Sequence, residues 1–249
     1  MIDGTLAFLD EPADEPLENY HDTHRALHVE SAVSYLDDEL TVQRGTVAGR
    51  VPKEEEIVSM NGHEIEVDRE TRTRTVPSDW IADVSGGGWV VAERTHTPRE
   101  QDEYLDIDWP FTEFVKRTGI DIDHVGFSPA QFVRNQRDAD RDYTIEMASR
   151  EYNGDDVSIE WGQGALKKDA IKSDVGVALT TLWNGEFVRL VVYGSGYFAI
   201  WEPEEMQIEE FARFVDEEIV PIAHVLEDET EGGEDESEQD TLERAEVGA

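Results

Sequence analysis

The sequence has no cysteine among its 249 residues, which excludes disulfide bonds, thiolate zinc sites and cysteine nucleophiles. It also has no apolar run near the ~18 residues that a membrane-spanning helix needs. The opening MIDGTLAFLDEP lacks the basic and then apolar pattern of a secretory signal. We therefore expect a cytoplasmic protein that has no contact with a membrane.

Motifs that bind phosphates or carry nucleophiles are missing as well. Gly86–Gly88 is not followed by the GK[ST] of a P-loop, and no G-x-G-x-x-G opens a helix after a strand. Gly194-Ser195-Gly196 is not the G-x-S-x-G elbow of a hydrolase and is better interpreted as a turn. We expect no cofactor, and these absences favour a protein that is not an enzyme.

Basic residues are scarce, and lysine is the scarcer of the two types. The chain carries 59 Asp and Glu against 21 Lys and Arg, a net charge of −38, and only five of the basic residues are lysine. This composition is typical of proteins from extreme halophiles, in which carboxylates keep the surface hydrated and molar salt shortens the Debye length to ~3 Å. We interpret the overall charge as an adaptation to the solvent.

Three Asn-Gly pairs predict β-hairpins, because a type I′ turn needs two residues of positive φ and Asn-Gly supplies them. Only five asparagines occur in the chain, and three of them precede glycine. The predicted hairpins join 56–60 to 63–68, 144–152 to 155–161, and 176–183 to 186–193. Further strands are predicted at 26–36, 40–51, 80–84, 89–93 and 197–201. The strands of the last meander are apolar on nearly every residue, so we expect it to be covered on both faces.

Three helices are predicted. One begins at Asp108-Trp109-Pro110 and ends at Gly119, and a second begins with the capping box Ser128–Gln131 and runs to about Arg137. After Pro203 a third helix has one apolar stripe, which we expect to pack on the meander: Met206 or Ile208, Phe211, Ala212, Val215 and Ile219. The predicted fold class is α+β, with antiparallel β-meanders and hairpins, two or three helices packed on the sheet, and disordered acidic termini.

Composition divides the chain into four parts. We expect an acidic flexible segment at 1–24, a β-rich half with a helix at 25–126, a β-meander with the C-terminal helix at 127–226, and a disordered acidic tail at 227–249. The two halves form either one domain or the two copies of a duplication. The second alternative rests on GGGWVVAE and GSGYFAIWE, each of which is followed by a predicted helix and then by a His-Val pair.

Two groups of residues have metal-ligand chemistry, but neither predicts a metal site. Asp121 and Asp123, followed by His124, form a carboxylate pair that could hold Mg²⁺ with mostly water ligands. Such pairs also arise by chance in a chain that is so rich in carboxylates. Three histidines fall within residues 21–28, but on a helix the outer two lie ~10 Å apart, too far to share one ion without further ligands.

The lysines are distributed unevenly, because three of the five fall within six residues of the segment GQGALKKDAIKSD. Two arginines one helical turn apart follow the capping box, and Arg141 continues their spacing if the helix persists that far. We predict an anion-binding face, with a nucleic-acid backbone as its ligand. Its residues are Lys167, Lys168, Lys172, Arg134, Arg137 and Trp161. The alternative is that these cations balance neighbouring aspartates.

These observations lead to one function hypothesis and two alternatives. The leading hypothesis is a non-catalytic binding or regulatory protein whose partner is a nucleic acid or a protein. One alternative is a metal-dependent hydrolase that uses clustered carboxylates. The other is a self-assembling interaction protein, in which the apolar meander presents an edge or a face to a second copy.

The charge predicts that the fold depends on salt. With a net charge of −38, unscreened repulsion grows as the salt concentration falls, so the protein is expected to lose structure below roughly molar KCl. Circular dichroism during dialysis measures this directly. A spectrum that is unchanged at ~0.1 M salt contradicts the halophile interpretation.

Overall fold

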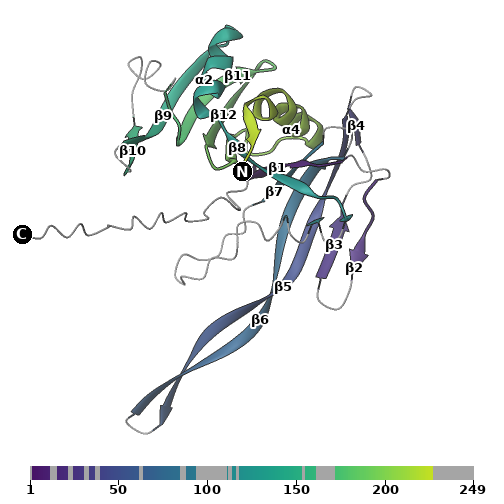
Figure 1. Ribbon diagram of the computed structural model, residues 1–249, viewed down its shortest axis with the longest axis vertical. Coiled ribbons are helices and arrows are strands. Elements are labelled where there is room, and N and C mark those ends of the chain that lie inside the picture. The colour runs from purple at the N-terminus through teal and green to yellow at the C-terminus, as the bar shows by residue number, and fades with distance from the viewer. Residues whose placement is uncertain are drawn as a thin grey trace, which may run out of the picture.

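Antiparallel β-structure dominates the computed structural model, and it includes one sheet of fourteen strands (Figure 1). The structure describes residues 2–11, 16–21, 25–30, 34–36, 40–61, 64–84, 88–93, 111, 114–115, 118–152, 155–160 and 172–226. The main path through the sheet is β10-β9-β11-β12-β13-β1-β7-β6-β5-β3-β2. Two α-helices have both ends within the described residues, so the α+β class is confirmed in this coarse form, with sheet as the larger part.

The bounds of the elements are as follows. The strands are β1 (Ile2–Leu9), β2 (Tyr20–His21), β3 (Arg25–Val29), β4 (Ser34–Leu36), β5 (Leu40–Asn61), β6 (Glu64–Asp83), β7 (Trp89–Ala92), β8 (Ile122–Phe127), β9 (Tyr143–Tyr152), β10 (Asp155–Glu160), β11 (Gly176–Trp183), β12 (Glu186–Tyr193), β13 (Tyr197–Glu202) and β14 (Ala223–Val225). The helical elements are α2 (Pro129–Asp138), α4 (Ile208–Phe214), a π-helical turn (Val215–Ile219) and a 3-10 turn (Val220–Ile222).

Within the described ranges, no helix is long and apolar enough to cross a bilayer.

The predicted hairpins are present. Trp183 lies opposite Glu186, and the connecting Asn184 and Gly185 have φ values of 47° and 85°, as a type I′ turn requires. β9 and β10 pair up to Tyr152 and Asp155, as predicted. The first hairpin differs in length, because β5 and β6 pair over almost their whole lengths and Asn61 is itself paired, opposite Glu64.

Strand β1 joins the two halves of the sheet. Its first residues pair with β13, from Ile2 opposite Ile200, and its later residues pair with β7 on the other edge. It also pairs with β8 through Ala7 and His124. Leu6 faces the larger core cluster and Ala7 the second one, and both are fully buried. The strand is therefore covered on both faces.

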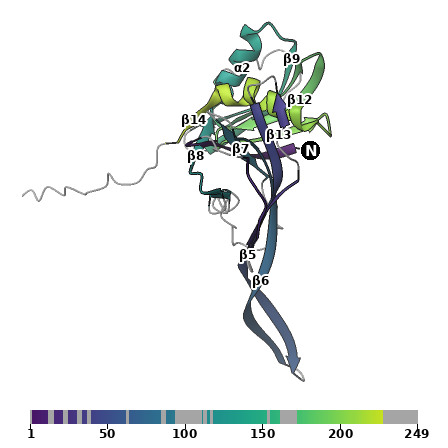
Figure 2. The same cartoon turned by 90° about the vertical axis from the view of Figure 1, so that its right-hand side faces the viewer.

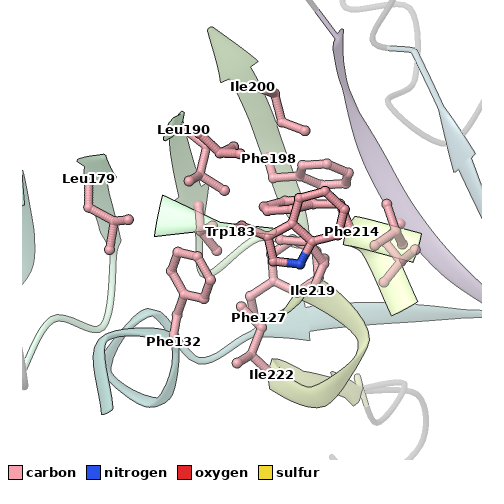
Figure 3. Packing of buried hydrophobic residues seen from close by; sticks show 14 of the residues in the cluster. Phe127, Phe132, Leu179, Trp183, Leu190, Phe198, Ile200, Phe214, Ile219 and Ile222 are labelled. Atoms are coloured by element: carbon pink, nitrogen blue, oxygen red, sulfur yellow. The ribbon is translucent and has the colours of Figure 1, made fainter. Parts of the chain in front are cut away.

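The larger core forms where α4 and the π-helical turn pack on the meander of β11, β12 and β13 (Figure 3). The predicted stripe is buried, with Phe211, Ala212, Val215 and Ile219 all at 0% exposure. The rings of Phe211 and Phe198 stack with centroids 6.1 Å apart, and Phe214 meets Trp183 edge to face at 5.3 Å. The helical run ends in the 3-10 turn Val220–Ile222, which contains Pro221.

The second core lies on the opposite face of the sheet. Phe111 and Phe114 pack there, and Phe114 meets Trp80 edge to face at 5.4 Å. Gly119 has a φ of 74° and donates its N–H to Val115, which confirms the predicted end of this helix. Its predicted beginning at residues 108–110 lies outside the described part of the chain.

The same order of elements occurs twice. β5, β6 and β7 are followed by helical residues and then by β8, and β11, β12 and β13 are followed by α4 and then by β14. β8 and β14 pair with each other, with His224 opposite Gly126. This arrangement is the one that a duplication of the meander and its helix would produce.

A buried polar network fixes α2 to the helical run after β13. Ser128 caps α2 by accepting a hydrogen bond from the Gln131 N–H, as predicted. Within the network, Gln136 donates to Glu218 at 2.8 Å and accepts from the Thr181 hydroxyl at 2.7 Å. The Gln136 amide, the Glu218 carboxylate and the Thr181 hydroxyl thus have partners in this network, without which their burial would be costly.

The packing predicts a large difference between two phenylalanines. Phe211→Ala removes a fully buried ring and is expected to lower the free energy of unfolding by ~3–5 kcal/mol. Phe187→Ala is the control, because Phe187 is 61% exposed and its change is expected to stay within ~0.5 kcal/mol. Chemical denaturation in high salt measures both values. Equal losses for the two variants contradict the assignment of the stripe to the core.

Candidate functional site

The predicted anion-binding face is only partly described. Lys167, Lys168 and Trp161 lie outside the described residues. Lys172 is exposed in the turn before β11, and Arg134 and Arg137 are exposed on α2. Arg137 pairs with the adjacent Asp138 at 2.8 Å, and Arg134 hydrogen-bonds Gln131 at 3.4 Å. The anion-binding face therefore remains a prediction.

Arg141 does not continue the spacing of these arginines. α2 ends at Asp138, and Asp140 has a φ of 52°, which turns the chain away from the helix axis. The Arg141 guanidinium instead pairs with Glu218 at 2.6 Å inside the buried network. The helix ends within one residue of the predicted Arg137, so the condition under which Arg141 would have joined the other two arginines is not met.

The weak metal candidates do not converge. Asp121 and Asp123 are exposed, whereas Ile120 and Ile122 pack against the second core, so carboxylates and isoleucines alternate here. His124 follows on the other side of the strand, and its ring lies 5.5 Å from that of Phe111. No three His, Asp or Glu side chains of the described residues are grouped as ligands for a metal ion. Of residues 21–28, His21 and His28 are exposed and His24 is not described.

The meander carries an ion pair on the face away from α4. Arg189 of β12 donates two hydrogen bonds to Glu146 of β9, at 2.9 and 2.7 Å, and the Thr180 hydroxyl donates a third at 2.8 Å. The hydrogen bond from Arg189 holds the pKa of the Glu146 carboxyl below 4.5, its ordinary value, although burial acts in the opposite direction. The Arg189 guanidinium also lies 5.1 Å from the centroid of the Trp201 ring.

The same face of the meander carries a small apolar cluster with aromatic rings packed around it. Ala178, Val191 and Ala199 are each 2% exposed, and Met147, Tyr193, Tyr197 and Trp201 pack around them. The Tyr197 hydroxyl donates to Asp3 at 3.0 Å. Both faces of the meander are therefore buried at its centre, as predicted. Glu146, Arg189 and Thr180 bond one another on this face, and Tyr197 bonds Asp3.

β5 and β6 leave the body together as a long twisted ribbon (Figure 2). β3 pairs with β5 only as far as Gly49, and β7 pairs with β6 only from Trp80. The twelve paired positions from Arg50–Thr75 to Asn61–Glu64 lie beyond these neighbours, and we call them the arm. At ~3.3 Å per residue the arm projects by roughly 36 Å.

Exposed apolar side chains gather on one side near the end of the arm. Val58 lies opposite Val67, and Met60, two residues along, shares their side because side chains alternate. These three residues, which we call the apolar tip, are 62%, 55% and 79% exposed. An ion pair between Glu56 and Arg69, at 3.3 Å, ends the apolar stretch toward the body. Ile57 lies on the opposite side and is 36% exposed.

The sequence predicted this hairpin but not the exposure of its apolar side chains. A signal is present in EIEVDRE (64–70), where apolar and acidic residues alternate as they do in a ribbon with one apolar and one acidic side. The same alternation is expected of a strand that covers a core. Only the three-dimensional structure shows that no core of the described residues lies under the apolar tip.

Comparisons with known proteins do not narrow the function. No family model matches the sequence, and no curated protein matches it.

The Glu146–Arg189 pair predicts a pH dependence of stability. A carboxyl whose pKa is depressed on folding stabilises the fold above its unfolded pKa, and this contribution is lost as the pH falls through the folded pKa. The difference in unfolding free energy between the wild type and Glu146→Gln is therefore expected to be largest above the ordinary pKa of 4.5 and to shrink as the pH falls below it. Urea unfolding at several pH values measures it.

Glu202→Gln is the matched control, since Glu202 is 61% exposed and 3.8 Å from the same guanidinium. The difference in unfolding free energy between the wild type and Glu202→Gln is expected to be small at every pH. A Glu146 difference that does not vary with pH contradicts the assignment of the stabilisation to this ion pair.

Proposed function

We propose that this protein is a non-catalytic binding protein that holds a macromolecular partner through the arm. The observation that carries the proposal is the apolar tip, in which Val58, Met60 and Val67 are exposed together on one side of a projecting ribbon. Contiguous exposed apolar side chains rimmed by polar residues are typical of protein interaction sites.

The energy of burial supports this interpretation. Full burial of a valine or methionine side chain is worth ~1.5–3 kcal/mol, so a partner that covers the apolar tip gains several kcal/mol. Adaptation to salt does not account for the tip, because that adaptation places carboxylates at the surface. A ribbon that served only as a connection would need no apolar residues at its far end.

A nucleic-acid contact through the lysines and arginines is a second proposal. Its support is that Arg134, Arg137 and Lys172 are all exposed. The arm is not expected to take part, because its carboxylates repel phosphates. For a hydrolase there is no comparable support, since the carboxylates of the described residues do not gather as metal ligands.

Substitution of the apolar tip tests the main proposal. Val58→Ser, Met60→Ser and Val67→Ser are combined, and the full-length protein is purified by affinity from cells grown and lysed in molar salt. The wild type is expected to retain a partner that the triple variant loses, while their circular dichroism spectra agree. Nuclease treatment of the same samples separates protein partners from nucleic acid.

Ile57→Ser is the matched control, because it removes an apolar side chain from the opposite side of the same arm. It is expected to retain the partner. Equal recovery with the wild type, the triple variant and the control would show that the arm is not the contact element.

A further inference from the structure

We infer that the partner of the arm is a protein whose surface has an apolar pocket surrounded by lysine and arginine side chains. This inference rests on the proposed function and adds the chemical class of the partner. It follows from the charges around the apolar tip, from the length of the tip and from the alternation of apolar and acidic residues along the two strands.

The end of the arm is far more acidic than it is basic. Residues 54–71 contain seven carboxylates and one arginine, a net charge of −6. The single arginine, Arg69, is already paired with Glu56 at 3.3 Å. Carboxylates that approach a partner together with the apolar tip are costly to desolvate unless that partner supplies opposite charges.

These carboxylates occupy defined positions. On the side of the ribbon opposite the apolar tip, every paired position carries at least one of them. The pairs are Glu55–Glu70, Ile57–Asp68, Ser59–Glu66 and Asn61–Glu64. By the pairing register, acidic positions therefore alternate with those of the apolar tip. A partner pocket that receives the tip also approaches these acidic positions.

The same charges argue against other partners. Nucleic acids and anionic lipid surfaces carry phosphates, which carboxylates repel. In a contact between the arms of two copies of this chain, a net charge of −6 would face another net charge of −6. The apolar tip is also short, about two paired positions or ~7 Å of ribbon, whereas a stable interface needs roughly 800 Å² on each partner. A pocket that surrounds the ribbon provides that area, and a second flat ribbon does not.

The experiment first identifies the partner and then measures the effect of charge. A photoreactive p-benzoyl-phenylalanine replaces Met60 in the full-length chain, and cross-links are formed in cells that make the protein. The cross-linked peptides are identified by mass spectrometry. We expect them to come from another protein and to lie beside lysines and arginines.

The identified protein is then purified and titrated with variants of this chain in ~1 M KCl. Long-range attraction is screened at that ionic strength, so differences report charges in direct contact. Glu64→Lys, Glu66→Lys and Asp68→Lys are combined and are expected to raise Kd at least 10-fold. The control is Glu204→Lys, Glu205→Lys and Glu209→Lys, which makes the same change in charge at exposed positions of the body and is expected to leave Kd within 2-fold.

The other outcomes of the cross-linking and of the titration contradict the inference, the proposed function or both. Cross-links to a second copy, to nucleic acid or to lipid overturn the inference, as does a protein partner with an acidic surface. If the serine variant of the apolar tip loses binding but the lysine variant of the arm does not, the inference fails and the proposed function stands. If neither variant changes Kd, or if no cross-link forms, the proposed function fails as well.

Discussion

Repulsion among carboxylates is the constraint under which this fold must hold together. With 59 acidic and 21 basic side chains, compaction brings like charges closer, and exposed ion pairs such as Glu56–Arg69 contribute little against that. The compensating interaction is apolar packing, above all that of α4 and the π-helical turn on the meander. The buried carboxylate of Glu218 is stabilised by Arg141 and Gln136, which pair with it directly.

Local structure could be predicted from the sequence because its causes are local. Asn184-Gly185 has the positive φ values of its turn, Ser128 caps α2, and the spacing of Phe211, Val215 and Ile219 defines a buried stripe. The place of β1 at the centre of the sheet was not predicted, since pairing between Ile2 and Ile200 leaves no pattern in either segment. The end of α2 at Asp138 lies one residue from the predicted Arg137, but the contact of Arg141 with Glu218 beyond it was not predicted, because it joins segments far apart in the sequence.

The candidate site illustrates the same limit. Apolar and acidic residues alternate along the strands of the apolar tip, and a strand that covers a core shows the same alternation. The sequence therefore predicted a hairpin at 56–68 but not its exposure. What distinguishes Val58 and Met60 from Val90 or Leu190 is the absence, in the described chain, of an element that packs on them. The lysine cluster was singled out by composition instead, and composition cannot place it relative to Arg134.

The central position of β1 also bears on how the protein is made. β1 leaves the ribosome before both of its neighbours in the sheet, and one of its edges can pair with β7 (Trp89–Ala92) once that strand has followed. Its other edge waits for β13, with Ile2 opposite Ile200, and at ~5–20 residues per second that partner arrives roughly 5–20 s after β7. During this interval a growing chain exposes an unpaired strand edge, on which two chains could join. In molar salt the Debye length is only ~3 Å, so the carboxylates of two nascent chains oppose such joining only when the chains are almost in contact.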